Sequence, residues 1–224
     1  MRRRLYLMRH GAVSYFDRDG RPVPPDEVSL TDEGRAQAEA ARALLEPATF
    51  DRVLASGLPR TVETARIVAP GASLEEWPEL QELRGASLAS IPAEQLETEF
   101  VHAFRGVVPN DKRFLGGETI GELFDRVLPA LDRLLANDDW DTVLAVLHGA
   151  VNRAILSYAL TGEPMFLGHF EQAAGCVNVL DVGDEWPGNS IVRAVNVAPL
   201  DLLHASTRLT TMEGYWAEFQ GSSW

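Results

Sequence analysis

The sequence of 224 residues predicts an α/β fold, a three-layer helix–sheet–helix sandwich with a largely parallel central sheet. Short apolar runs alternate with segments of helical periodicity through most of the chain, which is the pattern of strand–helix–strand units. The run Thr142–Leu147 is apolar apart from its first residue, as in strands that helices cover on both faces. A hydrophobic fraction of 46% is enough for one buried core. We therefore expect residues 1–224 to form a single domain.

Three short strands are expected in the first part of the chain, over Arg4–Met8, Phe50–Ala55 and Ser73–Trp77. Asp, Gly and Pro residues between Ala12 and Ser29 predict a loop after the first strand. Thr31 is placed to cap a helix that continues to about Leu45. A second helix follows the turn Ser56–Pro59 and carries Arg60.

The periodicity weakens in residues 86–116, so we expect an insertion over one end of the sheet, with one helix near Pro92–Phe104. A strongly amphipathic helix is predicted over Thr119–Leu135, and Pro129 within it predicts a kink. After the strand Thr142–Leu147, the remaining expected elements are a helix from His148-Gly149 to about Leu160, a hairpin of Val177–Val182 with Ser190–Val197, and a tail over 201–224.

The composition limits the classes of partner and of chemistry. A formal charge of −13 argues against nucleic acid and anionic membrane as partners, and an anion site would need a local cluster of basic residues. The single cysteine, Cys176, excludes an internal disulfide and is expected to be a core side chain. The apolar run Leu5–Met8 is shorter than a signal-peptide core, and no segment approaches about 20 apolar residues, so we expect a cytoplasmic protein.

Polar residues directly follow several of the predicted strands. Arg9-His10-Gly11 follows the first strand, Ser56 the second, and His148-Gly149 the strand Thr142–Leu147. Ligands of parallel sheets bind outside the carboxyl ends of the strands. We therefore expect these side chains to meet at one edge of the sheet, together with Glu82 from the loop after Trp77.

In their order and spacing these motifs resemble the histidine phosphatase superfamily, which includes the cofactor-dependent phosphoglycerate mutases. The resemblance covers Leu7–Gly149, about two thirds of the chain, and implies a phosphoglycerate mutase-like fold. The matching segments are Leu7–Gly11, Leu30–Gly34 with Gln37-Ala38, Ser56–Ala65, Leu80–Gly85, Gly116–Thr119 and Val146–Gly149.

The resemblance implies that His10 is the nucleophile and that Arg9, Arg60 and His148 surround the phosphoryl group. Chemistry supports these roles, because a neutral imidazole is a competent nucleophile and a covalent phosphoenzyme divides one difficult displacement into two. Phosphoryl transfer needs fixed positive donors around the oxygens, and arginine binds phosphate with two parallel hydrogen bonds. Backbone N–H groups at the helix start beside Gly149 are expected to assist.

Glu82 is implied as the proton donor to the leaving alkoxide and then as the base that activates water, for which it must be protonated before the reaction. Ser56 and Glu118 complete the expected set as residues that bind or border the phosphate, although Glu118 also fits a simple helix start. The competing carboxylates are Glu75, Glu76 and Glu79, and the histidines that match no motif are His102, His169 and His204.

The sequence has no His-Glu-x-x-His motif, cysteine cluster or nucleotide-binding Gly-rich loop, so we expect neither a metal ion nor another cofactor. The predicted function is metal-independent hydrolysis of a small phosphomonoester through a phosphohistidine. Two alternatives stay open: phosphoglycerate mutase-type phosphotransfer, and a non-catalytic phosphate-binding module. The stretch Glu82–Gly85 lacks the His and Tyr usual in mutases, which favours hydrolysis, and a binding module has no use for His10 and Glu82 together.

The substrate is not defined by the sequence. The family's usual Glu-Thr and Asn after Arg-His-Gly are absent from the run Ala12–Phe16, which removes an expected substrate contact. The loop Tyr15–Pro25 and the insertion are expected to select the substrate. In the insertion, Phe104, Arg105, Lys112 and Arg113 either meet a second anionic group of the substrate or form a solvated face.

Overall fold

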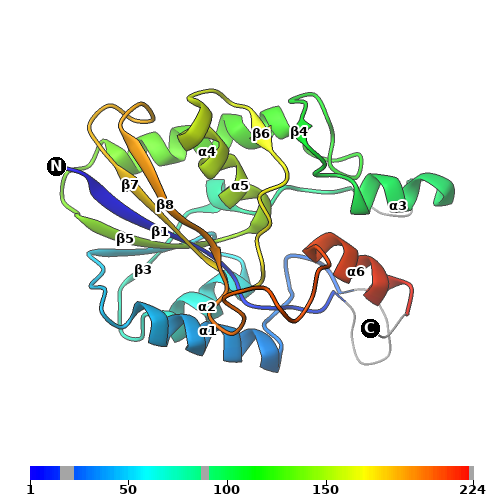
Figure 1. The fold of residues 1–224 in the computed structure, drawn as a ribbon, viewed down its shortest axis with the longest axis horizontal. Coiled ribbons are helices and arrows are strands. Elements are labelled where there is room, and N and C mark those ends of the chain that lie inside the picture. The colour runs from blue at the N-terminus through cyan, green and yellow to red at the C-terminus, as the bar shows by residue number, and fades with distance from the viewer. Residues whose placement is uncertain (16–22, 87–90, 222–224) are drawn as a thin grey trace.

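A six-stranded sheet with the strand order β3-β2-β5-β1-β7-β8 forms the middle layer of the molecule (Figure 1). The first four strands in this order are parallel, and β7 and β8 continue the sheet as antiparallel strands. The computed structural model describes residues 1–15, 23–86 and 91–221. The six strands are β1 (Arg3–Arg9), β2 (Arg52–Ala55), β3 (Leu74–Glu76), β5 (Thr142–Leu147), β7 (Val177–Val182) and β8 (Ser190–Val197).

Helices cover both faces of this sheet. On one face lie α1 (Asp32–Leu45) and α2 (Pro59–Val68), and on the other lie α4 (Ile120–Leu135) and α5 (Gly149–Thr161) (Figure 1). The predicted three-layer sandwich with a largely parallel sheet is therefore confirmed. No helix in the described ranges is both long and apolar enough to cross a membrane.

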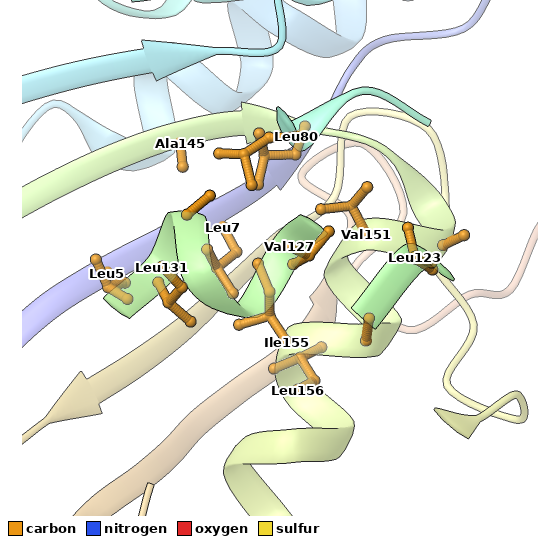
Figure 2. Close-up of a cluster of buried hydrophobic side chains, with 14 of the residues drawn as sticks. Leu5, Leu7, Leu80, Leu123, Val127, Leu131, Ala145, Val151, Ile155 and Leu156 are labelled. Atoms are coloured by element: carbon orange, nitrogen blue, oxygen red, sulfur yellow. The ribbon is translucent and has the colours of Figure 1, made fainter. Parts of the chain in front are cut away.

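The period of two along β1 supplies both halves of the core. Leu5 and Leu7 point to the face covered by α4 and α5, where they join a cluster that contains Val127 and Ile155 (Figure 2). Met8 points to the opposite face and packs in the cluster under α1 and α2. A strand buried on both faces has no polar alternation, which explains the apolar character of this run.

Helix caps lie where the sequence indicates them. The Thr31 hydroxyl accepts from the Gly34 N–H at 3.1 Å, and Thr119 forms a reciprocal capping box with Glu122. Helix α4 continues without interruption through Pro129, and the kink expected there stays a prediction.

The predicted insertion contributes little regular structure. Its helix is α3 (Ala93–Val101), and its strand β4 (Val107–Val108) pairs with β6 (Phe166–Leu167) from the far end of α5. A short 3-10 helix, η1 (Pro78–Leu80), precedes the Glu82 loop. Residues 87–90 of the insertion, and residues 16–22 of the expected selecting loop, lie outside the described part of the chain.

The expected tail, residues 201–224, contains a helix that the sequence did not predict. This helix is α6 (Thr211–Phe219), which begins with a capping box between Thr210 and Glu213. The helix packs against α3, where the rings of Phe100 and Trp216 lie 6.3 Å apart. Helices this short are not stable alone. Its formation depends on contacts with segments distant in sequence, which local periodicity does not reveal.

Candidate active site

The carboxyl ends of β1, β2 and β5 bring the strand-end residues together. The strands are adjacent, and their register pairs Arg9 with Leu147 and Ala55 with Val146. His10 and His148 therefore emerge side by side, with ring centroids 5.2 Å apart and planes inclined by 65°.

Burial and one hydrogen bond hold His10 as a neutral imidazole. Only 1% of the residue is exposed, and its Nδ1 lies 2.7 Å from the Gly11 carbonyl oxygen. A carbonyl only accepts hydrogen bonds, so Nδ1 carries the hydrogen and Nε2 keeps its lone pair. Burial, together with the positive charges of Arg9 and Arg60, lowers the pKa of His10 well below its usual value. At neutral pH the side chain is thus uncharged, which is the form of an imidazole that can act as a nucleophile.

Gly11 explains why the motif needs glycine after the histidine. A Cβ at this position would lie 2.3 Å from the carbonyl oxygen of Gly34, at the start of α1. The Gly11 N–H donates to the Thr64 hydroxyl of α2 at 3.1 Å. The backbone after His10 is therefore fixed against both helices of one layer, and any larger residue would displace it.

Arg9 and Arg60 are buried guanidinium groups with incomplete hydrogen bonding. Arg9 is 5% exposed and donates to the Gln172 carbonyl at 2.6 Å, to Thr211 Oγ1 at 2.9 Å and to the Tyr215 hydroxyl at 3.1 Å. Arg60 donates to the carbonyl of Pro25 at 2.6 Å. The Nε of each arginine is buried without a partner among the described residues. Unpaired charged donors beside a nucleophile are suited to an anionic ligand.

Ser56 is hydrogen-bonded to His148. The Thr61 hydroxyl donates to the Leu58 carbonyl at 2.8 Å, so its oxygen is the acceptor for the Ser56 hydroxyl at 3.0 Å. Ser56 Oγ in turn accepts from His148 Nε2 at 2.7 Å. This chain of bonds assigns the hydrogen of the neutral His148 ring to Nε2 and leaves a lone pair on Nδ1.

His148 Nδ1 is buried and has no partner in the described parts of the chain. Burial, followed by the charge of Arg60, lowers the pKa of His148 well below its usual value. Donation to a phosphoryl oxygen requires a second proton on the ring, and a phosphate dianion next to it would favour that proton. Anion binding and proton uptake are therefore coupled at His148.

Glu82 lies at the N-terminus of α5. Its Oε1 accepts from the N–H of Leu83 at 2.9 Å and from that of Ala150 at 3.2 Å, while Oε2 is 3.5 Å from the second of these nitrogens. Oε2 is the oxygen nearer to Gly149, 3.8 Å from the position that a Cβ would take there. Oε1 thus receives the two shorter bonds, and Oε2 has only the 3.5 Å contact with the Ala150 nitrogen among the described residues. An assisting role for the Gly149 amide stays a prediction.

The loop that carries Glu82 is fixed by Arg126 of α4. Its guanidinium donates to the carbonyl oxygens of Glu79 and Gln81, both at 2.7 Å, and of Glu82 at 3.1 Å. Glu118 accepts from Arg126 Nε at 2.6 Å and from its NH2 group at 2.9 Å. The expectation that Glu118 binds phosphate is not supported, because both of its oxygens accept hydrogen bonds from Arg126. Glu118 directly precedes Thr119, the N-cap of α4, and this position brings it close to the Glu82 loop.

The competing carboxylates have other partners or no contact with the site. Glu75 forms two bonds with Arg52, at 2.8 and 2.6 Å, and Glu79 pairs with Arg133 at 3.0 Å. Glu76 is exposed. Of these four carboxylates, Glu82 is the one that binds the first turn of α5, directly after His148.

The structure adds residues that the sequence interpretation missed. Thr211 and Tyr215 of α6 both bind Arg9, and the ring of Tyr215 makes an edge contact with Tyr15, with centroids 5.2 Å apart. Arg153 of α5 is 5% exposed and places its NH1 group 3.1 Å from the position of a Cβ at Gly149. The only local signal was spacing, since residues four apart share one face of a helix.

The remaining basic and sulfur-containing candidates lie outside the chemistry. Lys112 pairs with Glu99 at 2.6 Å, and Arg113 donates to the Gly117 carbonyl, which supports the solvated-face interpretation of these two residues.

Burial raises the pKa of the Cys176 thiol to about 12, so it is a core side chain and not a nucleophile. The described residues contain no group of three or more His, Cys, Asp or Glu side chains arranged to hold a metal ion. Of the unmatched histidines, His169 and His204 are exposed, and His102 is partly buried at the end of α3.

Comparison with known proteins places this geometry in a family. The profile of the histidine phosphatase superfamily (branch 1) matches residues 5–194. The adenosylcobalamin/alpha-ribazole phosphatase of Salmonella typhimurium is 30% identical over 192 residues, which cover 80% of this chain and 90% of the relative. The acid phosphatase of Mycobacterium tuberculosis is 30% identical over 161 residues, covering 69% and 74%.

Solved structures agree with the sequence relatives. An Escherichia coli structure described as an alpha-ribazole-5'-P phosphatase is similar with a TM-score of 0.68 at 25% identity, covering 87% of this chain and 96% of the other. A mycobacterial glucosyl-3-phosphoglycerate phosphatase shares the fold with a TM-score of 0.68, covering 88% and 99%, at 20% identity. The profile match and the relatives show that this chain belongs to the histidine phosphatase superfamily.

Proposed function

We propose that the chain is a metal-independent hydrolase of a small phosphomonoester, acting through a phosphohistidine on His10. The observation that carries the proposal is the state of His10: a buried neutral ring whose Nδ1 donates to a carbonyl, so that Nε2 keeps its lone pair. Around it lie the guanidinium groups of Arg9 and Arg60, whose Nε atoms have no partner in the described part of the chain. Nucleophile and counter-charge are thus both supplied by side chains.

In the first step, His10 Nε2 attacks phosphorus and the bond from phosphorus to the ester oxygen breaks. The leaving oxygen takes the proton from Glu82, and the phosphoryl group is left on the imidazole. Arg9, Arg60 and a protonated His148 donate to its oxygens while charge develops.

In the second step, Glu82 removes a proton from water, whose oxygen attacks phosphorus and displaces His10 Nε2. Inorganic phosphate is released, and both groups return to their starting states. The same carboxyl group thus acts as acid and then as base. The bond from Nδ1 to the Gly11 carbonyl keeps the ring in one orientation through both steps.

Phosphotransfer between substrates is the second candidate. Some relatives are named probable phosphoglycerate mutases, such as that of Erwinia tasmaniensis at 29% identity over 160 residues. Relatives named as phosphatases, at 30% identity, cover up to 80% of the chain. A probable phosphoglycerate mutase of Salmonella paratyphi A is 32% identical over 165 residues, so identity alone does not separate the two activities. The lack of the mutase-type His and Tyr after Glu82 favours water as the acceptor. The cytoplasmic location expected from the sequence stays a prediction.

Hydrolysis of an aryl phosphate between about pH 4.5 and 8, with a chelator present, tests the proposal in wild type and His10→Ala. We expect turnover that resists the chelator and disappears in the variant. Turnover that survives in His10→Ala would refute the mechanism. Absence of wild-type hydrolysis with phosphoryl exchange between two phosphoglycerates would support the mutase candidate instead.

A further inference from the structure

Arg153 has a buried nitrogen without a hydrogen-bond partner among the described residues, as do the residues expected to bind the phosphoryl group. Arg9, Arg60 and His148 each have one buried nitrogen without a partner among the described residues. Arg153 is the third arginine with such a nitrogen in the described ranges, again Nε. It belongs to none of the sequence motifs that identify the site.

The position of Arg153 follows from helix geometry. It is four residues after Gly149 on α5, and long side chains of a helix lean toward the N-terminus over the preceding turn. Because Gly149 has no side chain, the guanidinium reaches the start of the helix. There NH1 lies 3.1 Å from the position of a Gly149 Cβ, and Arg9 Nε and Glu82 Oε2 are each 3.8 Å from the same point.

The charge of Arg153 is weakly compensated by the protein. Among the described residues its ion pair is a 3.3 Å contact from NH2 to Glu171, a carboxylate that also accepts from the N–H and hydroxyl of Thr211. Elsewhere in this protein, arginines hold a carboxylate with both Nε and NH2, at 2.7 and 3.1 Å for Arg4 with Asp181. Charge-assisted hydrogen bonds are usually about 2.7–2.9 Å long.

The side chain of Arg153 is nevertheless buried. The Arg153 guanidinium lies 5.2 Å from the centre of the Phe104 ring, which covers one face of it. Burial lowers the pKa of Arg153, with Glu171 opposing this change, but an arginine remains charged. A buried cation with one long contact is costly unless a ligand completes its hydrogen bonding.

The charge balance of the site indicates which ligand that is. A phosphoryl dianion and Glu171 together carry three negative charges, whereas Arg9, Arg60, Arg153 and a protonated His148 carry four positive ones. Since Glu82 must be protonated to act as an acid, the site keeps one positive charge in excess, and Arg153 has only the 3.3 Å contact with Glu171 to balance it. Arg153 lies beside Glu82, which is the side from which the leaving group departs. Resting on the proposed function, we infer that Arg153 binds a second anionic group, such as a carboxylate, on the leaving-group portion of the substrate.

The test compares two phosphomonoesters that differ in one group, 3-phosphoglycerate and glycerol 3-phosphate, as competitive inhibitors of aryl phosphate hydrolysis. In the wild type, the inhibition constant of the carboxylate-bearing compound is expected to be about tenfold or more lower. In Arg153→Gln the ratio of the two constants should fall to about one. Arg42→Gln, an exposed arginine of α1, should keep the wild-type ratio.

The ratio of inhibition constants does not depend on the fraction of folded enzyme, so loss of stability in Arg153→Gln does not obscure the result. A wild-type ratio near one, or equal weakening of both inhibitors in the variant, would overturn the inference and leave Arg153 as a phosphoryl or structural group. If the wild type hydrolyses no aryl phosphate, the proposed function fails. Calorimetric binding of the same two compounds then decides on Arg153 separately.

Discussion

Replacing Ser56 with alanine should disable His148 without touching the nucleophile. The Ser56 hydroxyl is the acceptor that fixes the hydrogen of His148 on Nε2, at 2.7 Å. Both residues are completely buried, so no water takes the place of the lost hydroxyl. The ring then loses its orienting bond, and its buried N–H is left unpaired.

The expected loss of kcat/KM follows from the buried hydrogen bond between Ser56 and His148. Removing one partner from a buried hydrogen bond that involves an ionised group costs about 1.5–3 kcal/mol. If the loss falls on the transition state, where His148 is protonated, kcat/KM decreases by roughly 10- to 100-fold. The affinity for inorganic phosphate should also lose part of its increase at low pH, because that increase depends on a proton on His148.

Ser157→Ala is the matched control. Ser157 is also completely buried and its hydroxyl accepts a bond, from the Leu167 N–H at 2.9 Å, but it lies on the far part of α5. Both variants should lose comparable stability in urea unfolding, and only Ser56→Ala should lose kcat/KM. If Ser56→Ala stays within about twofold of the wild type in kcat/KM and phosphate affinity, the assigned relay is wrong.

Three further outcomes are expected. Because the pKa values of His10 and His148 are lowered in the folded protein, the unfolded chain binds more protons than the folded one below about pH 6.5. The free energy of unfolding should therefore fall as pH decreases from there, by about 1.4 kcal/mol per pH unit for each histidine. A double variant to Asn that keeps the wild-type pH slope in urea titrations would contradict this. Arg126→Gln should release the Glu82 loop and lower kcat about tenfold for alkyl phosphates but less for nitrophenyl phosphate, whose leaving group needs no proton; equal losses would exclude a role in proton donation. Tyr215→Phe removes one bond to a site arginine and should raise KM a few-fold with little change in melting temperature, whereas an unchanged KM would mean that α6 does not support the site.

The sheet and the centre of the site were predictable because local rules determine them. Apolar runs buried on both faces identify strands, and the residue after each strand lies at the ligand-binding edge. This logic placed His10, Ser56 and His148 together without tertiary information. The bond between Ser56 and His148, however, depends on the register of two strands and was not predictable.

The missed features depend on contacts between distant segments. Thr211 and Tyr215 reach Arg9 across about 200 positions of sequence, and no periodicity reveals such a contact. Glu118 was expected at the phosphate because of its motif, but the loop geometry gives its oxygens to Arg126. The position of Arg153 near the site could have been predicted, because it lies four residues after the glycine at the start of α5. Its burial could not have been predicted from the sequence.

If a phosphoryl group passes through His10 Nε2, it can be trapped on the enzyme during turnover. The wild type is mixed with a phosphomonoester labelled on phosphorus, quenched in alkaline denaturant within milliseconds, and analysed by mass spectrometry of its peptides. We predict label on the peptide that contains His10, stable to alkali and lost in mild acid as expected for a phosphoimidazole, and no label in His10→Ala. Turnover without labelled protein, or label that persists in His10→Ala, would contradict the account.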